Sequence, residues 1–153
     1  MNSLERKIRV DQSHCNYHLS LHLGENGWQI LFRDPGRVSR GFSGSQEVLL
    51  GLFERNGLPI PDVVCLKEGD LLLIEVDKSI RNNIASMVSY HESEALILHE
   101  LSLAGYECNQ LVIGFCKVGI ATASERAAVL GVDGVLLADF PHPFPPRLEW
   151  FES

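Results

Sequence analysis

The chain has 153 residues, with 13 Lys and Arg against 20 Asp and Glu, so its formal charge is −7 with neutral histidines. This length suits one compact domain, and 45% hydrophobic with 22% charged residues excludes a disordered, collagen-like or coiled-coil chain. The acidic balance also argues against a broad cationic surface for nucleic acid, and leaves room only for a small basic cleft.

Residues 17–23 predict a first strand, because apolar and polar residues alternate there. The apolar face of this strand consists of Tyr17, Leu19, Leu21 and Leu23. A glycine-rich turn follows at 24–27 and a second strand at 28–32, so we expect an N-terminal β-hairpin. Residues 33–44 predict a loop, and the hairpin with this basic loop makes up residues 1–43.

Residues 44–139 predict the core of the domain. A helix capped by Ser43 or Ser45 ends at Asn56-Gly57, and two strands at 61–66 and 71–77 flank a tight turn at 67–70. A long helix over 79–103 ends at Gly105 and is followed by a strand at 110–116, a helix at 122–130 and a strand at 134–139. This order predicts an α/β fold with a mixed sheet flanked by helices, followed by a proline-rich, non-regular tail over 140–153.

Three carboxylates mark the predicted hairpin of the core. Asp62 begins its first strand, while Glu75 and Asp77 end the second and share one face, because side chains two apart in a strand point the same way. Ionised groups at the ends of buried strands are costly to desolvate, so they suit a hard divalent cation better than a core. Such a cation activates water and stabilises the charge on a phosphate, and Lys78 adds a nearby ammonium.

At these residues the chain resembles the PD-(D/E)xK nuclease superfamily, which includes restriction endonucleases and Holliday-junction resolvases. The element order over 44–139 follows the core of that family. The resemblance implies a restriction-endonuclease-like fold in a single nuclease-like domain over residues 1–153. It also implies a DNA substrate, a homodimer, and Mg²⁺, or Mn²⁺ in its place, bound by Asp62 and Glu75. Lys78 would be the catalytic lysine, and Glu47 in the first core helix would support the metal or the water.

One position departs from the family pattern. The family lysine lies two residues after the second acid, where this chain has Asp77, and Lys78 comes one residue later. Asp77 can replace the lysine, a bulge can turn Lys78 inward, or catalysis can have been lost. Glu92 on the long helix is a weaker alternative for the second acid. The alternative function is therefore a catalytically inactive domain of the same fold that binds nucleic acid or protein.

Each acid also has a purely structural interpretation. Asp62 can start a turn after Pro61, and Glu75 can pair with Lys78 or Arg81. Asp77 can cap the long helix from its N-terminal side. An exposed glutamate such as Glu47 in the first turn of a helix needs no further explanation.

A second cluster consists of His14, Cys15, His18 and His22. On a helix this spacing would align the histidines on one face and suit zinc. The alternation at 17–23 favours a strand instead, in which His18 and His22 lie too far apart to share an ion. We therefore expect a solvated strand face here.

The remaining signals concern location and phosphate contacts. No apolar stretch approaches the roughly 20 residues of a membrane helix, and the charged N-terminus lacks a signal core, so we expect a cytoplasmic protein. The four cysteines form no CxxC pair, which favours reduced, mostly buried thiols. The basic residues placed nearest a phosphate backbone are Arg33, Arg37, Arg40, Lys78 and Arg81. Together these features predict a Mg²⁺-dependent DNA endonuclease.

Overall fold

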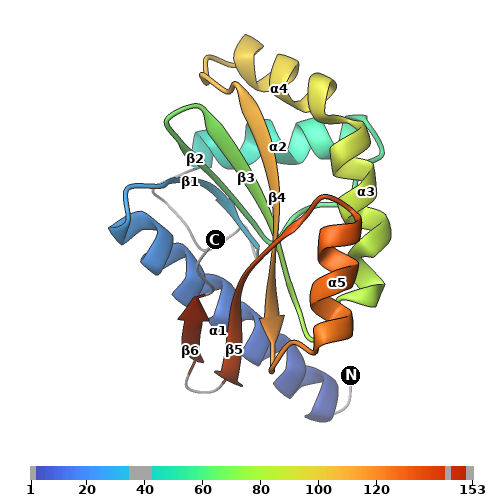
Figure 1. The fold of residues 1–153 in the computed structure, drawn as a ribbon. Coiled ribbons are helices and arrows are strands. Elements are labelled where there is room, and N and C mark those ends of the chain that lie inside the picture. The colour runs from blue at the N-terminus through green and yellow to red at the C-terminus, as the bar shows by residue number, and fades with distance from the viewer. Residues whose placement is uncertain (1–2, 35–42, 144–145, 151–153) are drawn as a thin grey trace.

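A computed structural model describes residues 3–34, 43–143 and 146–150 (Figure 1). The helices are α1 (Ser3–Glu25), α2 (Ser43–Arg55), the short 3₁₀ helix η3 (Arg81–Asn83), α3 (Ile84–Glu92), α4 (Glu94–Leu103) and α5 (Ala123–Gly131). The strands are β1 (Gln29–Arg33), β2 (Val63–Lys67), β3 (Asp70–Asp77), β4 (Gln110–Val118), β5 (Val135–Pro143) and β6 (Pro146–Trp150). The fold is thus α/β, with a mixed sheet flanked by helices, as predicted.

The described strands form a six-stranded sheet in the order β1-β2-β3-β4-β5-β6. The outer pairs β1–β2, β2–β3 and β5–β6 are antiparallel, and β3–β4 and β4–β5 are parallel. The predicted hairpin β2–β3 is confirmed, and Glu68 and Gly69 turn it with φ angles of 50° and 86°. The three parallel strands consequently end at the same edge of the sheet, where ligands bind in open α/β sheets.

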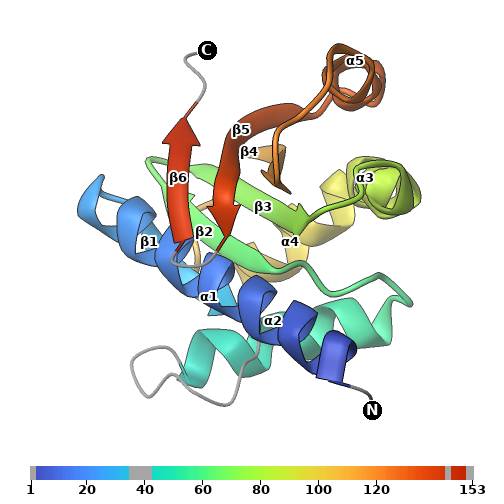
Figure 2. The ribbon, with the colours of Figure 1, turned by 90° about the horizontal axis from the view of Figure 1, so that it is seen from below.

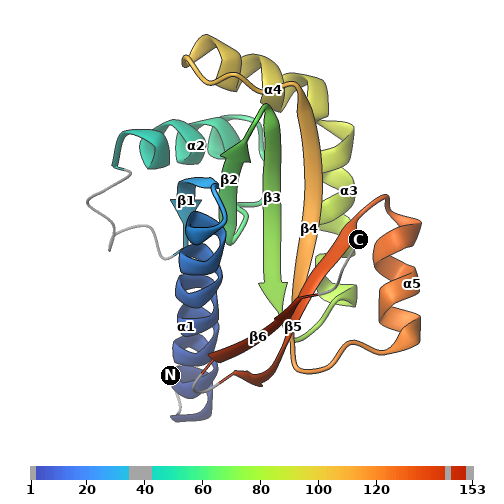
Figure 3. The same ribbon diagram turned by 60° about the vertical axis from the view of Figure 1, so that its left-hand side comes forward.

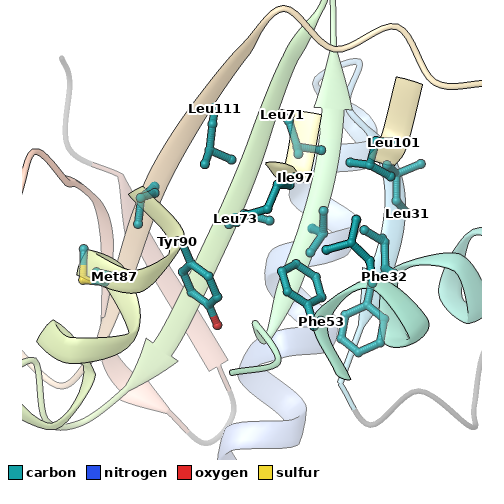
Figure 4. Packing of buried hydrophobic residues seen from close by; sticks show 14 of the residues in the cluster. Leu31, Phe32, Phe53, Leu71, Leu73, Met87, Tyr90, Ile97, Leu101 and Leu111 are labelled. Carbon is teal, nitrogen blue, oxygen red and sulfur yellow. The ribbon is translucent and has the colours of Figure 1, made fainter. Parts of the chain in front are cut away.

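The two faces of the sheet carry separate hydrophobic clusters. One cluster packs α2, α3, α4 and α5 on the sheet and includes Phe53, Leu73, Tyr90 and Leu111 (Figure 4). The other cluster lies under α1 alone. The sheet twists so strongly that α1 contacts β1 at one edge and β6 at the other, as Figures 2 and 3 show.

The predicted N-terminal β-hairpin is wrong, because residues 3–25 form helix α1. Cys15, Leu19 and Leu23 are buried at helical spacing, whereas Tyr17 and Leu21 are 51% and 47% exposed. The alternation at 17–23 therefore came from a helix whose apolar residues extend beyond its buried stripe. The second predicted strand does exist as β1, and it pairs with β2 rather than with the N-terminal segment.

Three further expectations need correction. The proline-rich tail is not irregular, because β5 continues to Pro143 and Pro146–Trp150 form β6 at the sheet edge, where proline is tolerated. The single long helix is divided into η3, α3 and α4, with the break at Ser93. Arg33 belongs to β1 rather than to a loop, and residues 35–42, with Arg37 and Arg40, lie outside the described residues.

Other expectations hold. The chain leaves α4 through Gly105, which has a φ angle of 96°. All four cysteines are free, and Cys15, Cys65 and Cys116 are buried. None of the described helices combines the length and apolar character that a membrane span requires.

Candidate active site

Asp62 and Glu75 face one another across the first residues of β2 and the last of β3. The register pairs Val63 with Ile74, and the Asp62 amide donates a hydrogen bond of 3.0 Å to the Ile74 carbonyl. Asp62 is therefore opposite Glu75 in the register, with Glu75 on the α3 side of the sheet, where Tyr90 contacts it, and the Asp62 carboxyl at the sheet end, where it contacts Val76 and Asn16 of α1. The structure thus brings together the two acids that the sequence predicted as metal ligands.

Asp62 is held by two amide donors. The Val76 backbone amide donates to Asp62 Oδ2 at 2.8 Å, and the Asn16 side chain on α1 donates to Asp62 Oδ1 at 3.3 Å. Asn16 Nδ2 also donates to the Asp34 carbonyl at 2.9 Å, so it ties α1 to the end of β1. Asn16 Oδ1 is buried and accepts no hydrogen bond from any described residue. This amide therefore leaves an oxygen atom beside the carboxylate pair.

Glu75 is held by Tyr90 on α3. The Tyr90 hydroxyl lies 2.8 Å from Glu75 Oε1 and 2.9 Å from the Pro59 carbonyl, and it has a single proton for the two acceptors. The Tyr90 ring packs edge-on against Phe53 of α2, with 5.9 Å between the ring centroids, and Figure 4 shows both side chains on the same face of the sheet. Tyr90 thus fixes the orientation of Glu75 from within the hydrophobic cluster.

Burial dominates the electrostatics of the pair, since Asp62 is 9% exposed and Glu75 is 6% exposed. Burial raises the pKa of Asp62 from 3.8 to about 6, although the amides of Val76 and Asn16 lower it. Burial, and then the charge of Asp62, raise the pKa of Glu75 from 4.5 to about 8, while the Tyr90 hydrogen bond lowers it. Burial and mutual repulsion raise the pKa of both carboxyls, so the pair retains a proton near neutral pH.

Asp77 and Lys78 lie at the end of β3. Asp77 is half-buried and accepts hydrogen bonds from the Lys78 amide at 2.7 Å and from Asn83 Nδ2 at 2.8 Å. It therefore fixes the turn into η3, close to the predicted capping role, although its Asn83 partner is a side chain and not a helix amide. The Lys78 side chain is exposed beyond the strand.

The other predicted residues belong to other elements. Glu47 is exposed near the start of α2, and Glu92 is exposed at the end of α3. Arg33 is buried, donates to Ser20 at 3.2 Å and stacks 4.9 Å from the Tyr17 ring, so it joins β1 to α1 and does not face solvent as expected. Arg81 is exposed on η3.

The histidine cluster requires a correction, because it lies on a helix and not on a strand. His14, His18 and His22 fall on one stripe of α1, and the His18 ring lies 6.4 Å from Phe140. Within the described residues, no group of three or more His, Cys, Asp or Glu side chains is arranged to hold a metal ion. The histidines thus form a row along α1 without gathering around one point.

Asn16 and Tyr90 are the site residues that sequence reasoning missed. Asn16 was hidden by the strand interpretation, because only a helix places it beside Cys15 and Leu19 on the buried face. Tyr90 lies in the predicted long helix, where its spacing is that of an ordinary hydrophobic core residue. A polar residue on the buried side of a helical pattern was the signal for Asn16, whereas nothing in the pattern marked Tyr90.

Comparison of the chain with protein-family models, with curated proteins and with solved structures found no match. Its function must therefore be argued from the geometry of the site.

Proposed function

We propose that this chain is a Mg²⁺-dependent DNA endonuclease whose active site contains Asp62 and Glu75. The observation that carries the proposal is the pair of buried carboxyls that Asp62 and Glu75 place opposite one another at the end of β3. Two buried acids face to face destabilise a fold unless a cation or a proton neutralises them. Strongly raised carboxyl pKa values of this kind are concentrated at functional sites.

The residues present fit Mg²⁺. This cation prefers oxygen ligands and is bound in proteins by one or two carboxylates, with water or substrate at its other positions. Asp62 and Glu75 supply the carboxylates, and the Asn16 Oδ1 atom is a buried oxygen next to them without a hydrogen-bond donor among the described residues. In phosphodiester hydrolysis a bound Mg²⁺ supplies activation of water and neutralisation of phosphate charge.

The protein's own groups prepare the site. Hydrogen bonds from Val76 and Asn16 orient Asp62, and a hydrogen bond from Tyr90 orients Glu75. Both carboxyls are therefore held in place before a ligand binds. The retained proton must leave when both carboxylates act as ligands, because coordination requires the ionised form. Asp77, two residues from Glu75 on the same face, adds negative charge that further favours a cation at this edge.

The sheet order supports the same proposal. An antiparallel hairpin that carries both acids, followed by a helix and a parallel strand, is the arrangement that the resemblance to PD-(D/E)xK nucleases implies. Cutting both strands of a duplex requires two such sites, so we propose a homodimer as the active form. Arg81, an exposed basic residue on η3 just after β3, is the side chain that we propose to contact the phosphate backbone.

The test is cleavage of supercoiled plasmid and of branched DNA in Mg²⁺ or Mn²⁺, with EDTA as the metal-free control. We expect cutting by the wild-type chain and its loss in Asp62→Asn and Glu75→Gln, which keep the size of each side chain. Glu54→Gln is the matched control, because Glu54 is an exposed glutamate on α2 that has no predicted role in the site. Glu47→Gln tests the predicted supporting role of Glu47 separately: slower cutting would support that role, and unchanged cutting would contradict it.

Two outcomes would overturn the proposal. Cutting that persists in both active-site variants would show that the activity lies elsewhere. Binding of DNA without cutting in either metal would instead support the inactive binding domain.

A further inference from the structure

Lys117 on β4 is a partly buried lysine that pairs in the sheet with Asp77, the position where the family pattern has its lysine. The parallel register pairs Asp77 with Lys117 and Lys117 with Asp139, so the three side chains form a row on the face that carries Glu75. The row lies at the common end of the parallel strands, one pleat beyond the carboxylate pair. Lys117 is therefore on the strand next to that of Glu75, although the two residues are far apart in the sequence.

The Lys117 side chain is fixed, unlike that of Lys78. It is 12% exposed, and its ammonium donates to Glu125 Oε2 at 2.7 Å and to the Lys78 carbonyl at 2.5 Å. Glu125 is itself held by Thr122 in the capping box that begins α5. An ammonium has three donors, and two are used here, which leaves the third N–H without an acceptor among the described residues.

The surroundings of the Lys117 side chain are acidic. Glu125 lies against the ammonium, and Asp77 and Asp139 flank Lys117 on the neighbouring strands. Asp139 is buried, its Oδ2 accepts from the Ala121 amide at 3.1 Å, and its Oδ1 accepts no hydrogen bond within the described part of the chain. Lys78, by contrast, extends into solvent, where salt screens its charge.

We infer that Lys117, rather than Lys78, is the catalytic lysine of the proposed nuclease, and that its free N–H binds a non-bridging oxygen of the scissile phosphate. This inference rests on the proposed function. In the reaction the oxygen of a water molecule bonds to phosphorus, one phosphorus–oxygen ester bond breaks, and the departing oxygen receives the proton that the water loses. The lysine keeps its own proton and stabilises the extra negative charge on the phosphorus oxygens.

The experiment compares Lys117→Met and Lys78→Met in single-turnover cleavage with Mn²⁺. Both substitutions keep the aliphatic chain and remove the charge. We expect Lys117→Met to slow cleavage at least about a hundredfold and Lys78→Met to change it by no more than about threefold. DNA affinity, measured by fluorescence anisotropy in Ca²⁺, should be nearly the same for both variants.

A second set of variants separates catalysis from support of the fold. Lys117→Ala should regain activity in proportion to added ethylammonium, which a merely structural role would not produce. Glu125→Gln keeps the capping box but removes the anion beside Lys117, and we expect it to retain the rate within about tenfold. Urea unfolding of each variant shows whether the fold persists.

The outcomes distinguish the inference from the function. If the wild-type chain cuts DNA through Asp62 and Glu75 but Lys117→Met cuts equally fast, the inference is overturned and the function stands. If Lys117→Met and Glu125→Gln lose activity alike and the amine restores none, Lys117 is structural and the inference is again overturned. If the wild-type chain does not cut DNA, both fall together.

Discussion

At the scale of single residues, the site is built from groups that are costly to bury. Asp62 and Glu75 each lose most of their hydration, and they repel one another when both are ionised. Hydrogen bonds from two amides replace part of the lost hydration of Asp62, and the Tyr90 hydroxyl does so for Glu75. Among the described residues, no lysine or arginine forms an ion pair with either carboxylate. A retained proton is what neutralises the pair in the absence of a cation.

This arrangement predicts an unusual pH dependence of stability in the absence of divalent metal. Both carboxyls have a pKa in the folded chain above the ordinary value, about 6 for Asp62 and about 8 for Glu75. The folded state therefore binds more protons than the unfolded state between about pH 4 and pH 8. The protonated pair stabilises the fold fully below this pH range, and this stabilisation is lost as the pH rises through the range. The free energy of unfolding should therefore fall by several kcal/mol between the two ends of the range.

Urea unfolding of the wild-type chain and of Glu75→Gln from pH 5 to pH 9 checks this prediction. The variant cannot ionise at position 75, so it should gain stability over the wild type as the pH rises. Glu94→Gln is a control at a partly exposed glutamate that accepts a hydrogen bond from the Leu111 amide, far from Asp62 in the fold. A difference between wild type and Glu75→Gln that does not change with pH would contradict the assignment of a retained proton.

A second prediction at this scale concerns the Tyr90 hydroxyl. Tyr90→Phe keeps the ring contact with Phe53 but removes the donor that serves Glu75 and Pro59. The loss of one buried hydrogen bond should lower the free energy of unfolding by about 1–3 kcal/mol. Chemical denaturation measures it, with Tyr17→Phe as the control on the exposed side of α1. Equal stability of the two variants would show that the hydroxyl contributes nothing to the fold.

At the scale of elements, the sequence predicted the central part of the fold and missed its two ends. The strands β2 to β4 and the helices α2 and α5 have clear apolar runs, glycine turns and caps, and these signals depend on neighbouring residues only. α1 was misread because Tyr17 and Leu21 are exposed apolar residues that imitate a strand pattern. β6 was missed because its partner β5 supplies pairing that no local signal in a proline-rich segment reveals.

A pair of leucines tests the corrected first element. Leu19 is buried in helix α1 and Leu21 is 47% exposed, whereas both would face the core equally in a strand. Leu19→Ala should lower the free energy of unfolding by about 2–5 kcal/mol, and Leu21→Ala should change it by no more than about 0.5 kcal/mol. Urea unfolding of the two variants gives the comparison. Equal losses at the two positions would favour the strand.

The same contrast applies to the site. Asp62 and Glu75 could be predicted because a hairpin places them together through local register alone. Asn16, Tyr90 and Lys117 come from α1, α3 and β4, and only the tertiary packing brings them to this edge of the sheet. The two acids at the strand ends could therefore be predicted from the sequence, but the residues from other elements that orient and complete the site could not.

At the scale of the whole molecule, the curvature of the sheet connects the site to both edges. α1 reaches from β1 to β6 across one face of the sheet (Figures 2 and 3). Asn16 on this helix donates hydrogen bonds to Asp62 and to the Asp34 carbonyl at the end of β1. A ligand that binds Asp62 and the Asn16 oxygen would hold α1, β1 and β2 together. Occupation of the site should therefore stabilise the entire domain and not only the hairpin.

Metal binding provides the prediction at this scale. Mn²⁺ or Mg²⁺ binds the folded chain only, so it should raise the midpoint of thermal unfolding, and the increase should grow with metal concentration. The increase should be larger at pH 8 than at pH 6, because the metal must displace the proton that Asp62 and Glu75 retain. Titration calorimetry in two buffers of different ionisation enthalpy should show the release of about one proton at pH 7. Asp62→Asn should abolish the stabilisation and the proton release together, whereas Glu54→Gln on the exposed side of α2 should keep both. Stabilisation that is independent of pH, or that survives Asp62→Asn, would place the metal away from the carboxylate pair.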